Sequence, residues 1–310
     1  MNARQRMPGH LRALPDGVSP APVVDAPEAA LDALAAWIDV HAPVLLLSGA
    51  GISTASGVGD YRNAAGEWKR KPPVTVQEFL ASEHGRRRYW ARSLVGWPQF
   101  RRARPNPAHV AVTALERAGL LTGVVTQNVD RLHQQAGTRN VVDLHGRLDR
   151  VVCLDCGRLE TREAVQERLA EANGPFLQFD ADAAPDGDAD LEGVAFDGFV
   201  LPTCTACGGT LKPDVVFFGE NVPRERVDQA YAWLETARGL LVTGSSLMVY
   251  SGFRFARKAA QSGRPIVLLN QGRTRADELA ALRAAAPLQH VLPAVAGRLA
   301  ADPGPDSATF

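Results

Sequence analysis

The stretch from Val44 to Arg62, VLLLSGAGISTASGVGDYR, constrains the fold of this chain more than any other. It opens with the apolar run Val44–Leu47, which stands between Pro43 and a glycine and is too short for a helix. A run of this kind is typical of a buried strand in a parallel sheet. The small residues of Gly49–Ser53 follow at once and predict a sharp turn into a helix start, where unpaired N–H groups bind anions. We therefore interpret this turn as a site for the pyrophosphate of a dinucleotide.

The glycine pattern alone leaves an alternative open. The dinucleotide fingerprint is G-x-G-x-x-G, and Thr54 occupies the position of the third glycine, so an ordinary strand–helix turn also fits. The next segment favours a binding site, because it adds a carboxylate, an aromatic ring and a guanidinium at Asp60, Tyr61 and Arg62. A glycine-containing segment with such side chains can fold over a ligand as a lid.

The composition excludes several classes of protein. The 310 residues are 45% hydrophobic and 22% charged, which is typical of a globular chain with one large and one smaller domain. The 34 Lys and Arg balance the 34 Asp and Glu, so a general electrostatic affinity for nucleic acid or anionic membranes is not expected. Neither a bilayer-spanning apolar run of roughly 20 residues nor a secretory signal is present, which predicts a cytoplasmic protein. Residues 1–26 and 302–310 are expected to be mobile tails.

The four cysteines fall into two C-x-x-C pairs, Cys153 with Cys156 and Cys204 with Cys207. This pattern is typical of a tetrahedral zinc site, and the glycine after each second cysteine allows a turn that points N–H groups at the thiolates. Two disulfides are the alternative, which is disfavoured in a chain without a secretory signal. A redox C-x-x-C would need only one pair. We therefore predict one structural zinc ion.

Further buried strands are predicted to end in small or polar residues. Because the carboxyl ends of parallel strands form the ligand edge of open α/β folds, this recurrence predicts a doubly wound parallel sheet with one edge built for a dinucleotide. His145 arrives at this edge, where it is either a satisfied structural histidine or a functional one. The strands are Leu120–Thr126, Val141–Leu144, Gly239–Thr243 and Pro265–Leu269. The residues that follow them are Gln127, Asn128, Val129, Asp130, His145, Gly244, Ser245, Ser246, Asn270, Gln271 and Gly272.

Helical spacing is found at residues 27–41, 107–119 and 161–172. The basic and aromatic segment 63–105 is either a nucleic-acid surface or a solvated helical face with aromatic anchors, and we favour the second. The acidic loop Asp180–Glu192 is predicted to be mobile, and we assign it no catalytic or binding role. The segment Lys212–Glu220, KPDVVFFGE, is predicted to be an extended apolar strand.

The chain resembles the sirtuins, whose motif series it carries in order over about residues 27–297. The motifs are GAGIS, SGVGDYR, TQNVDRLH, the LHG at His145, the two C-x-x-C pairs, KPDVVFFGE, GSSL and LLNQG. Four further segments, RYWARSLVGWPQF, PNPAHVA, APDGDAD and SSLMVYSGFRF, are most similar to class II sirtuins of the mitochondrial sirtuin-four type.

The resemblance implies an α/β fold in which a smaller zinc-ribbon and helical domain is inserted into a Rossmann-like doubly wound parallel sheet. The NAD-binding domain would comprise residues 27–62, 106–150 and 212–300. Residues 63–105 would be the helical insertion of the small domain, and residues 151–211 would be the zinc-binding module.

The resemblance also implies a reaction, NAD-dependent removal of acetyl or longer acyl groups from lysine. The products would be nicotinamide, O-acyl-ADP-ribose and free lysine, with NAD as co-substrate and one structural Zn²⁺. The expected partners are acyl-lysine proteins or peptides, with no membrane and no specific nucleic acid. His145 would be the catalytic base, and Asn128 and Asp130 would act with Gln127 and Val129 in the nicotinamide pocket.

The other roles carry over from matching motifs. The pyrophosphate would bind at Gly49, Ala50, Gly51, Ile52 and Ser53. The lid over the nicotinamide ribose would be Asp60, Tyr61 and Arg62. The strand that pairs with the substrate and walls the acyl tunnel would be Val215, Val216 and Phe217. The adenosine side would be Gly244, Ser245, Ser246, Asn270, Gln271, Gly272 and Leu288.

Three positions depart from the family pattern. Tyr61 replaces the usual phenylalanine, and Ser245 stands where many members have threonine. Some class II members recognise acidic acyl groups with a Tyr-x-x-Arg pair, and the segment Ala65–Arg70 lacks the tyrosine. A preference for succinyl or malonyl lysine is therefore not predicted.

Three alternative functions remain open at this point. A mono-ADP-ribosyltransferase would cleave NAD in the same way but modify an amino-acid side chain. A zinc-ribbon protein could bind nucleic acid through the basic residues of 69–104, although the zero net charge argues against it. A dehydrogenase would transfer hydride instead of cleaving the cofactor.

Overall fold

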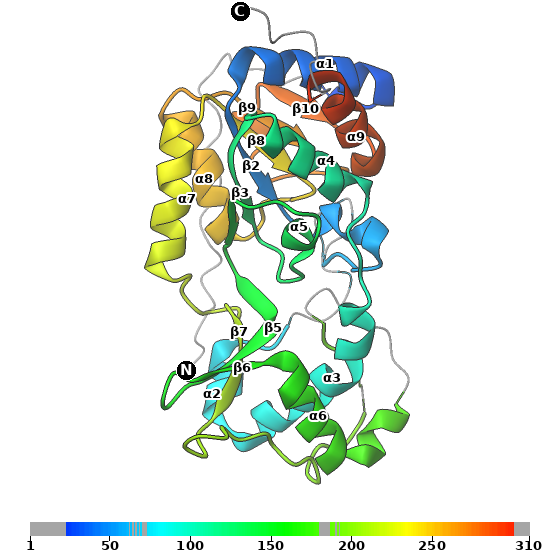
Figure 1. The fold of residues 1–310 in the computed structure, drawn as a ribbon, viewed down its shortest axis with the longest axis vertical. Helices are drawn as coiled ribbons and strands as arrows, with labels where there is room; N and C mark the ends of the chain where they lie inside the picture. The colour runs from blue at the N-terminus through cyan, green and yellow to red at the C-terminus, as the bar shows by residue number, and fades with distance from the viewer. Residues whose placement is uncertain are drawn as a thin grey trace, which may run out of the picture.

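The computed structural model describes residues 23–61, 63, 65, 67, 69, 73–179, 187–189, 191 and 193–300. Figure 1 shows two regions stacked along the long axis of the molecule. The larger region contains a parallel sheet with helices on both faces, and the smaller one contains a short antiparallel sheet with its own helices.

The larger sheet has seven strands in the described part of the chain, in the order β1-β10-β9-β8-β2-β3-β4, and all its pairings are parallel. The chain moves from β2 outward through β3 to β4 and then returns to the other side of β2 at β8, so the strand order reverses beside β2. This is the switch point at which open α/β folds bind ligands. The strands are β1 (Val23–Val24), β2 (Val44–Ser48), β3 (Leu121–Thr126), β4 (Val141–Asp143), β8 (Leu240–Thr243), β9 (Ile266–Leu269) and β10 (Leu282–Ala284).

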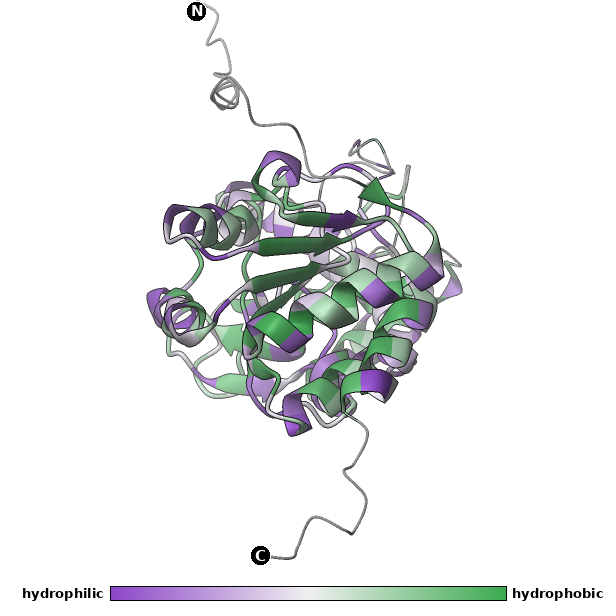
Figure 2. Cartoon of the chain, turned by 90° about the horizontal axis from the view of Figure 1, so that it is seen from above, coloured by the Kyte–Doolittle hydropathy of each residue, from purple (hydrophilic) through white to green (hydrophobic). Residues whose placement is uncertain are grey.

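Helices cover both faces of this sheet, as the doubly wound pattern predicts. One face packs against α1 (Pro27–His41), α4 (Pro107–Arg117) and α9 (Leu288–Leu299) in a single, mainly aliphatic core. The other face packs against α7 (Arg224–Thr236) and α8 (Tyr250–Gln261). Figure 2 shows the hydrophobic strands between these helices. The short helix α5 (Leu132–Gln135) and the 3₁₀ turn η4 (Asp277–Leu279) complete this region.

The smaller region has an aromatic core. Its antiparallel sheet has the order β6-β5-β7, with β5 (Gly146–Cys153), β6 (Leu159–Thr161) and β7 (Leu211–Val215). The elements that pack beside it are α2 (Val76–Ala81), α3 (Glu83–Arg101), α6 (Arg162–Ala172) and η3 (Gly174–Gln178). The α3 side chains Tyr89, Trp90, Leu94 and Trp97 are buried, so the basic segment is anchored by aromatic residues as predicted.

Local structure differs from the sequence prediction at several places. Val23–Val24, expected in a mobile tail, pairs with β10, because even two extended residues can add an edge strand to a sheet. Part of the predicted mobile acidic loop is packed, since the Ala189 N–H donates to the Arg92 carbonyl at 2.9 Å and Arg92 Nε donates back at 2.8 Å. Most of that loop lies outside the described residues, as do residues 1–22 and 301–310.

The strand pairing also shows where the two regions meet. Residues 146–150 and 212–215, which the sequence grouped with the larger region, pair in the smaller sheet. The predicted strand Lys212–Glu220 ends at Val215, and Phe218 lies beyond it in an isolated bridge with Thr75. The division into domains therefore stays a prediction. No helix among the described residues is long and apolar enough to cross a bilayer.

Candidate active site and cysteine cluster

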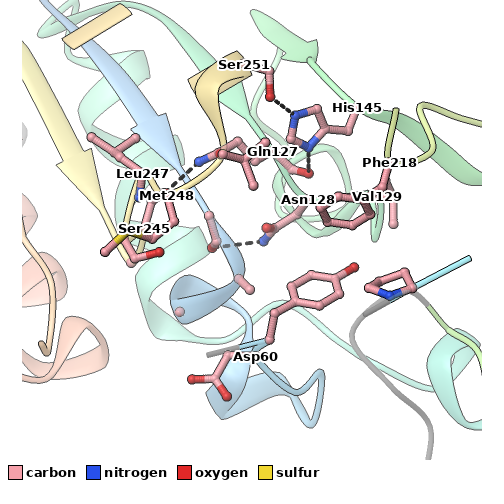
Figure 3. A pocket seen from close by; sticks show the side chains of 18 of the residues that line it. Asp60, Gln127, Asn128, Val129, His145, Phe218, Ser245, Leu247, Met248 and Ser251 are labelled. Atoms are coloured by element: carbon pink, nitrogen blue, oxygen red, sulfur yellow. Dashed lines mark hydrogen bonds between the residues drawn. The ribbon is translucent and has the colours of Figure 1, made fainter. Parts of the chain in front are cut away.

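The carboxyl ends of β2, β3, β8 and β9 open into one cleft that also contacts the smaller region, with a cavity volume of about 690 Å³. Most of the predicted site residues line this cleft (Figure 3). Ile52 and Ser53 lie buried behind it, Gly272 lines a neighbouring smaller cavity, and Arg62 lies outside the described residues. The predicted residues that line it are Gly49, Ala50, Gly51, Asp60, Tyr61, Gln127, Asn128, Val129, Asp130, His145, Val215, Val216, Phe217, Gly244, Ser245, Ser246, Asn270, Gln271 and Leu288.

The glycine turn after β2 differs from the predicted helix start. It forms two 3₁₀ turns, η1 (Ala50–Ile52) and η2 (Thr54–Ser56), and the N–H groups of Ile52 and Ser53 already donate to carbonyls of the turn. The glycines are needed for close backbone packing instead: a Cβ on Gly51 would lie 2.8 Å from the Gly244 Cα. The predicted anion site at this turn therefore has fewer free amides than an α-helix start would offer.

Behind the turn, three polar side chains are bonded to one another. The Ser53 hydroxyl donates to Asp130 Oδ2 at 2.7 Å, and Asn128 Nδ2 donates to Ser53 Oγ at 3.0 Å and to the Gly49 carbonyl at 3.1 Å. Burial raises the pKa of the Asp130 carboxyl, whereas the Leu132 N–H and the Ser53 hydroxyl oppose this shift. The two cleft residues Asn128 and Asp130 are thus held in fixed orientations.

Two buried histidines below this group were missed by the sequence analysis. His133 Nε2 lies 2.9 Å from the Ser48 hydroxyl, and the His109 ring lies 5.0 Å from the His133 ring. His109 Nδ1 accepts the Asn106 N–H at 3.3 Å. Burial lowers the pKa of His109 to about 4 and that of His133 to about 3. Both occur within quoted motifs, PNPAHVA and TQNVDRLH, but nothing in either pattern indicates that they meet.

His145 is held by one hydrogen bond on each ring nitrogen. Its Nδ1 lies 3.0 Å from the Gln127 carbonyl, which can only accept, so Nδ1 carries the proton and Nε2 is the free base. Nε2 lies 2.7 Å from the hydroxyl of Ser251 on α8, as Figure 3 shows. Burial lowers the pKa of His145 to about 4, and the guanidinium groups of Arg226 and Arg254 add to this effect. The imidazole is therefore neutral at neutral pH. Ser251 was not predicted.

The residues beyond β8 and β9 form the other end of the cleft. Gln127 Nε2 donates to Ser245 Oγ at 2.7 Å, which ties the ends of β3 and β8 together. Asn270 Nδ2 donates to the Gly272 carbonyl at 3.3 Å. The first residue of α9, Leu288, packs against the turn after β8, where a Cβ on Gly244 would lie 2.9 Å from its Cδ1.

The predicted lid lies at the mouth of the cleft. Asp60 forms an ion pair with Lys69, and the Lys69 N–H donates to the Tyr61 carbonyl at 3.0 Å. The chain therefore folds back on itself between these residues and keeps Asp60 and Tyr61 against the cavity.

The predicted substrate strand is braced from behind by a buried lysine. The Val216 N–H donates to the His145 carbonyl at 2.8 Å, which sets this strand beside the histidine. Lys212 Nζ donates to the Val215 carbonyl at 2.5 Å, lies 3.0 Å from Glu220 Oε2 and sits 4.6 Å from the centre of the Phe217 ring. The same carboxylate oxygen accepts the Phe217 N–H at 2.9 Å.

The four cysteines form one cluster in the smaller region. Their Sγ atoms all lie within 4.8 Å of one another, and the Cys153–Cys207 and Cys156–Cys204 Sγ separations are 3.5 and 3.7 Å. These distances are too long for disulfides, which need about 2.05 Å, but they suit the edges of a tetrahedron with Zn–S bonds of about 2.3 Å. Each knuckle turns at a glycine with positive φ, 73° at Gly157 and 71° at Gly208. The cluster therefore fits the predicted structural zinc.

Comparison with known proteins agrees with this geometry. The model of the Sir2 family matches residues 49–251. A protein of Xanthomonas campestris pv. campestris named NAD-dependent protein deacetylase is 58% identical over 251 residues, covering 81% of this chain and 86% of that protein. A protein of Bordetella bronchiseptica with the same name is 55% identical over 262 residues, covering 84% and 96%.

Solved structures are similar over the same extent. A structure of Sir2 with a p53 peptide and NAD⁺ has a TM-score of 0.70 and 28% identity, and the match covers 84% of this chain and 95% of that one. A structure of Sir2 bound to an acetylated peptide has a TM-score of 0.68 and 27% identity, with the same coverage of each chain.

Proposed function

This chain belongs to the Sir2 family, the sirtuins, and from that premise we propose that it is an NAD-dependent protein lysine deacetylase. The observation that carries the proposal is His145, a neutral imidazole that lines the same cleft as Asn128 and Asp130. The relatives at 55% and 58% identity are named NAD-dependent protein deacetylases, which supports the same reaction here.

In the proposed reaction, the first step displaces nicotinamide from NAD. Nicotinamide is a cationic leaving group, and the amide oxygen of the acyl-lysine attacks C1′ of the ribose from the opposite face. Holding the two reactants together contributes roughly 7–11 kcal/mol to such a step. We assign Asn128 and Asp130 to the nicotinamide pocket, because Ser53 fixes both side chains at the edge of the cleft. The ends of β8 and β9 would hold the adenosine.

His145 acts in the second step of the proposed reaction. A ribose hydroxyl attacks the imidate carbon formed in the first step, and its proton must be removed. Nε2 of His145 can accept it, because the bond from Nδ1 to Gln127 leaves a lone pair on Nε2. In the structure this lone pair accepts a hydrogen bond from the Ser251 hydroxyl. The ribose hydroxyl must therefore displace Ser251 or transfer its proton through the Ser251 hydroxyl.

The finer parts of the proposal concern products and substrates. We propose that the acyl group leaves as O-acyl-ADP-ribose and that Val215, Val216 and Phe217 wall the acyl chain, which allows acyl groups longer than acetyl. We also propose a placement among the class II sirtuins of the sirtuin-four type, because the segments RYWARSLVGWPQF, PNPAHVA, APDGDAD and SSLMVYSGFRF resemble that class. The cysteine cluster has a structural role in this account, because none of the four cysteines is among the described residues that line the cleft.

The test is a panel of lysine peptides with short, acidic, long and lipoyl acyl groups, incubated with NAD and analysed by mass. We expect nicotinamide, deacylated peptide and acyl-ADP-ribose in equal amounts with the acetyl peptide. Nicotinamide release with ADP-ribose attached to a protein, and no deacylated peptide, would instead indicate a mono-ADP-ribosyltransferase. Reduction of the nicotinamide ring without its release would indicate a dehydrogenase.

A further inference from the structure

The charged side chains that line the cleft differ in whether they are neutralised. Asp60 pairs with Lys69, and Glu220 pairs with Lys212. Arg254, on α8, has no carboxylate within 4.0 Å among the described residues. Its Nε is buried and has no hydrogen-bond partner within the same part of the chain. Burying an unpaired guanidinium at a cleft wall costs free energy unless a ligand accepts its hydrogen bonds.

The helical geometry of α8 places this guanidinium on the side of His145. Ser251 and Arg254 are three residues apart, so they share one face of the helix. Ser251 bonds to His145 Nε2 at 2.7 Å, and Arg254 is near enough to act on the imidazole electrostatically. The Arg254 guanidinium carbon also lies 5.5 Å from the centre of the Tyr250 ring, which holds the side chain without using its donors.

Two guanidinium groups, those of Arg226 and Arg254, act electrostatically on His145. On the side of the smaller sheet, Asp214 is shared by two arginines, with Arg150 Nε at 2.7 Å and Arg226 Nη2 at 3.5 Å. One carboxylate thus faces two guanidinium groups there, and Arg254 adds a third from α8. A negatively charged group that enters the cleft beside His145 would meet a favourable potential.

We propose that Arg254 binds a carboxylate of the substrate, next to the acyl-lysine amide that reacts at His145. This inference rests on the proposed deacylase function and names the substrate class. The planar guanidinium binds a carboxylate with two parallel hydrogen bonds. The carboxylate has two possible sources, the end of a dicarboxylic acyl chain or an Asp or Glu side chain beside the modified lysine. Arg254 would thus bind an acidic group from α8. The segment after the lid would not do so, because it lacks the tyrosine of the Tyr-x-x-Arg pair.

The experiment compares Arg254→Met with a matched control, Arg257→Met. Arg257 lies on the same helix and 5.3 Å from the same Tyr250 ring, but it is exposed and is not among the residues that line the cleft. Three peptides are used: acetyl-lysine with neutral neighbours, acetyl-lysine with glutamate neighbours, and glutaryl-lysine with neutral neighbours. The readout is kcat/KM for each acidic peptide divided by kcat/KM for the neutral one.

We expect Arg254→Met to lower this ratio roughly 10- to 100-fold for at least one acidic peptide, the range of a lost charge-assisted hydrogen bond. Arg257→Met should leave the ratio unchanged. A loss with the glutaryl peptide alone identifies the acyl chain as the source, and a loss with the glutamate peptide alone identifies the flanking residue. Both outcomes support the proposal.

Three results would overturn the proposal. If Arg254→Met slows all three peptides equally, Arg254 only positions His145. If it raises KM for NAD and leaves the ratio unchanged, the guanidinium binds a phosphate of the co-substrate. An unchanged ratio with unchanged KM shows that no carboxylate binds there. Failure of the wild-type protein to deacylate the neutral acetyl peptide would contradict the proposed function itself, which keeps the two failures distinct.

Discussion

The two regions of this molecule position their functional groups by different means. In the larger region the core is mainly aliphatic, with Trp37, Phe253 and Phe255 as its buried aromatic residues. The candidate site residues lie where buried strands end, so the backbone positions them. In the smaller region the core is aromatic and includes cations and thiols. There the cysteine cluster and a few buried charges hold the elements together.

Two buried cations show how charges hold the elements of the smaller region together. Arg162 is fully buried, donates to the Ser93 carbonyl at 3.1 Å and lies 5.1 Å from the Trp97 ring. Burial lowers the pKa of Arg162 to about 10. Lys212 is 5% exposed and braces the predicted substrate strand. Removing one partner from such a contact lowers the unfolding free energy, because it leaves a buried charge or polar group without a partner. We therefore expect the smaller region to respond more sharply to single substitutions away from the cleft.

The largest expected effect is loss of the metal. Cys204→Ser should release zinc and unfold the smaller region, because the binding free energy of a structural zinc, about 10–16 kcal/mol in small peptides, is also folding free energy. Zinc content by mass spectrometry and thermal unfolding measure both consequences. Thr205→Ser, an exposed neighbour, is the control. A fully folded wild-type protein without metal would show that the cluster has no such role.

The next largest effect concerns the larger region. Asn128→Ala should lower nicotinamide release by at least about 10²-fold, the loss that follows removal of one positioned donor. The thermal midpoint should change little, because Asn128 lies at the cleft and outside both hydrophobic cores of the larger region. Asn140→Ala, an exposed asparagine before β4, serves as the control. Nicotinamide release at the wild-type rate would remove Asn128 from the candidate site.

A smaller effect is expected at the brace of the substrate strand. Lys212→Met keeps the side-chain length but removes the ammonium, which should cost about 1–2 kcal/mol of unfolding free energy. It should also raise KM for the peptide several-fold while the affinity for NAD stays the same, because Val215 and Phe217 lose their support. Lys258→Met, exposed on α8, is the control. Equal changes in the peptide and NAD constants would argue against a specific brace.

The smallest effect is a pH dependence of stability in the larger region. The folded-state pKa values of His109 and His133, about 4 and about 3, lie below the unfolded value of 6.5, so the unfolded chain takes up protons first. The contribution of the two neutral histidines to the unfolding free energy is complete above about pH 6.5. It decreases on acidification, by up to about 1.4 kcal/mol per pH unit for each histidine.

Urea unfolding at several pH values between 6.5 and 5 measures this slope. His133→Gln should reduce it, whereas His84→Gln, an exposed histidine on α3, should not. An identical slope in wild type and His133→Gln would show that the buried pair does not titrate as described.

The sequence predicted the larger region better than the smaller one, for a physical reason. Apolar runs followed by polar residues identify parallel strands and their carboxyl ends, so Gln127, His145 and Ser245 could be placed at one edge. The cysteine spacing likewise predicted the cluster. Contacts made by folding could not be predicted: Ser251 reaches His145 across 106 positions, and Ser48 reaches His133 across 85. No periodicity indicates such pairs.

The structure also changed the interpretation of the glycine turn. The sequence predicted glycines that let a ligand approach a helix start, whereas Gly49 and Gly51 make room for the turn after β8. The glycine pattern correctly predicted a close approach to the backbone of this turn, but it could not show that the approaching group is the chain after β8 and not a ligand. A similar limit applies to Lys212, whose burial depends on Glu220 and Phe217 folding back over it.

The most direct test of the account measures two rates in His145→Ala, nicotinamide exchange and deacetylation of the neutral acetyl peptide. We predict that deacetylation falls by roughly 10²–10⁴-fold, the range for a lost general base, and that exchange falls much less, because nicotinamide leaves before the base is needed. NAD should still bind, since the other end of the cleft is intact. Equal collapse of both rates, or deacetylation within about threefold of wild type, would contradict the role of His145 as the base.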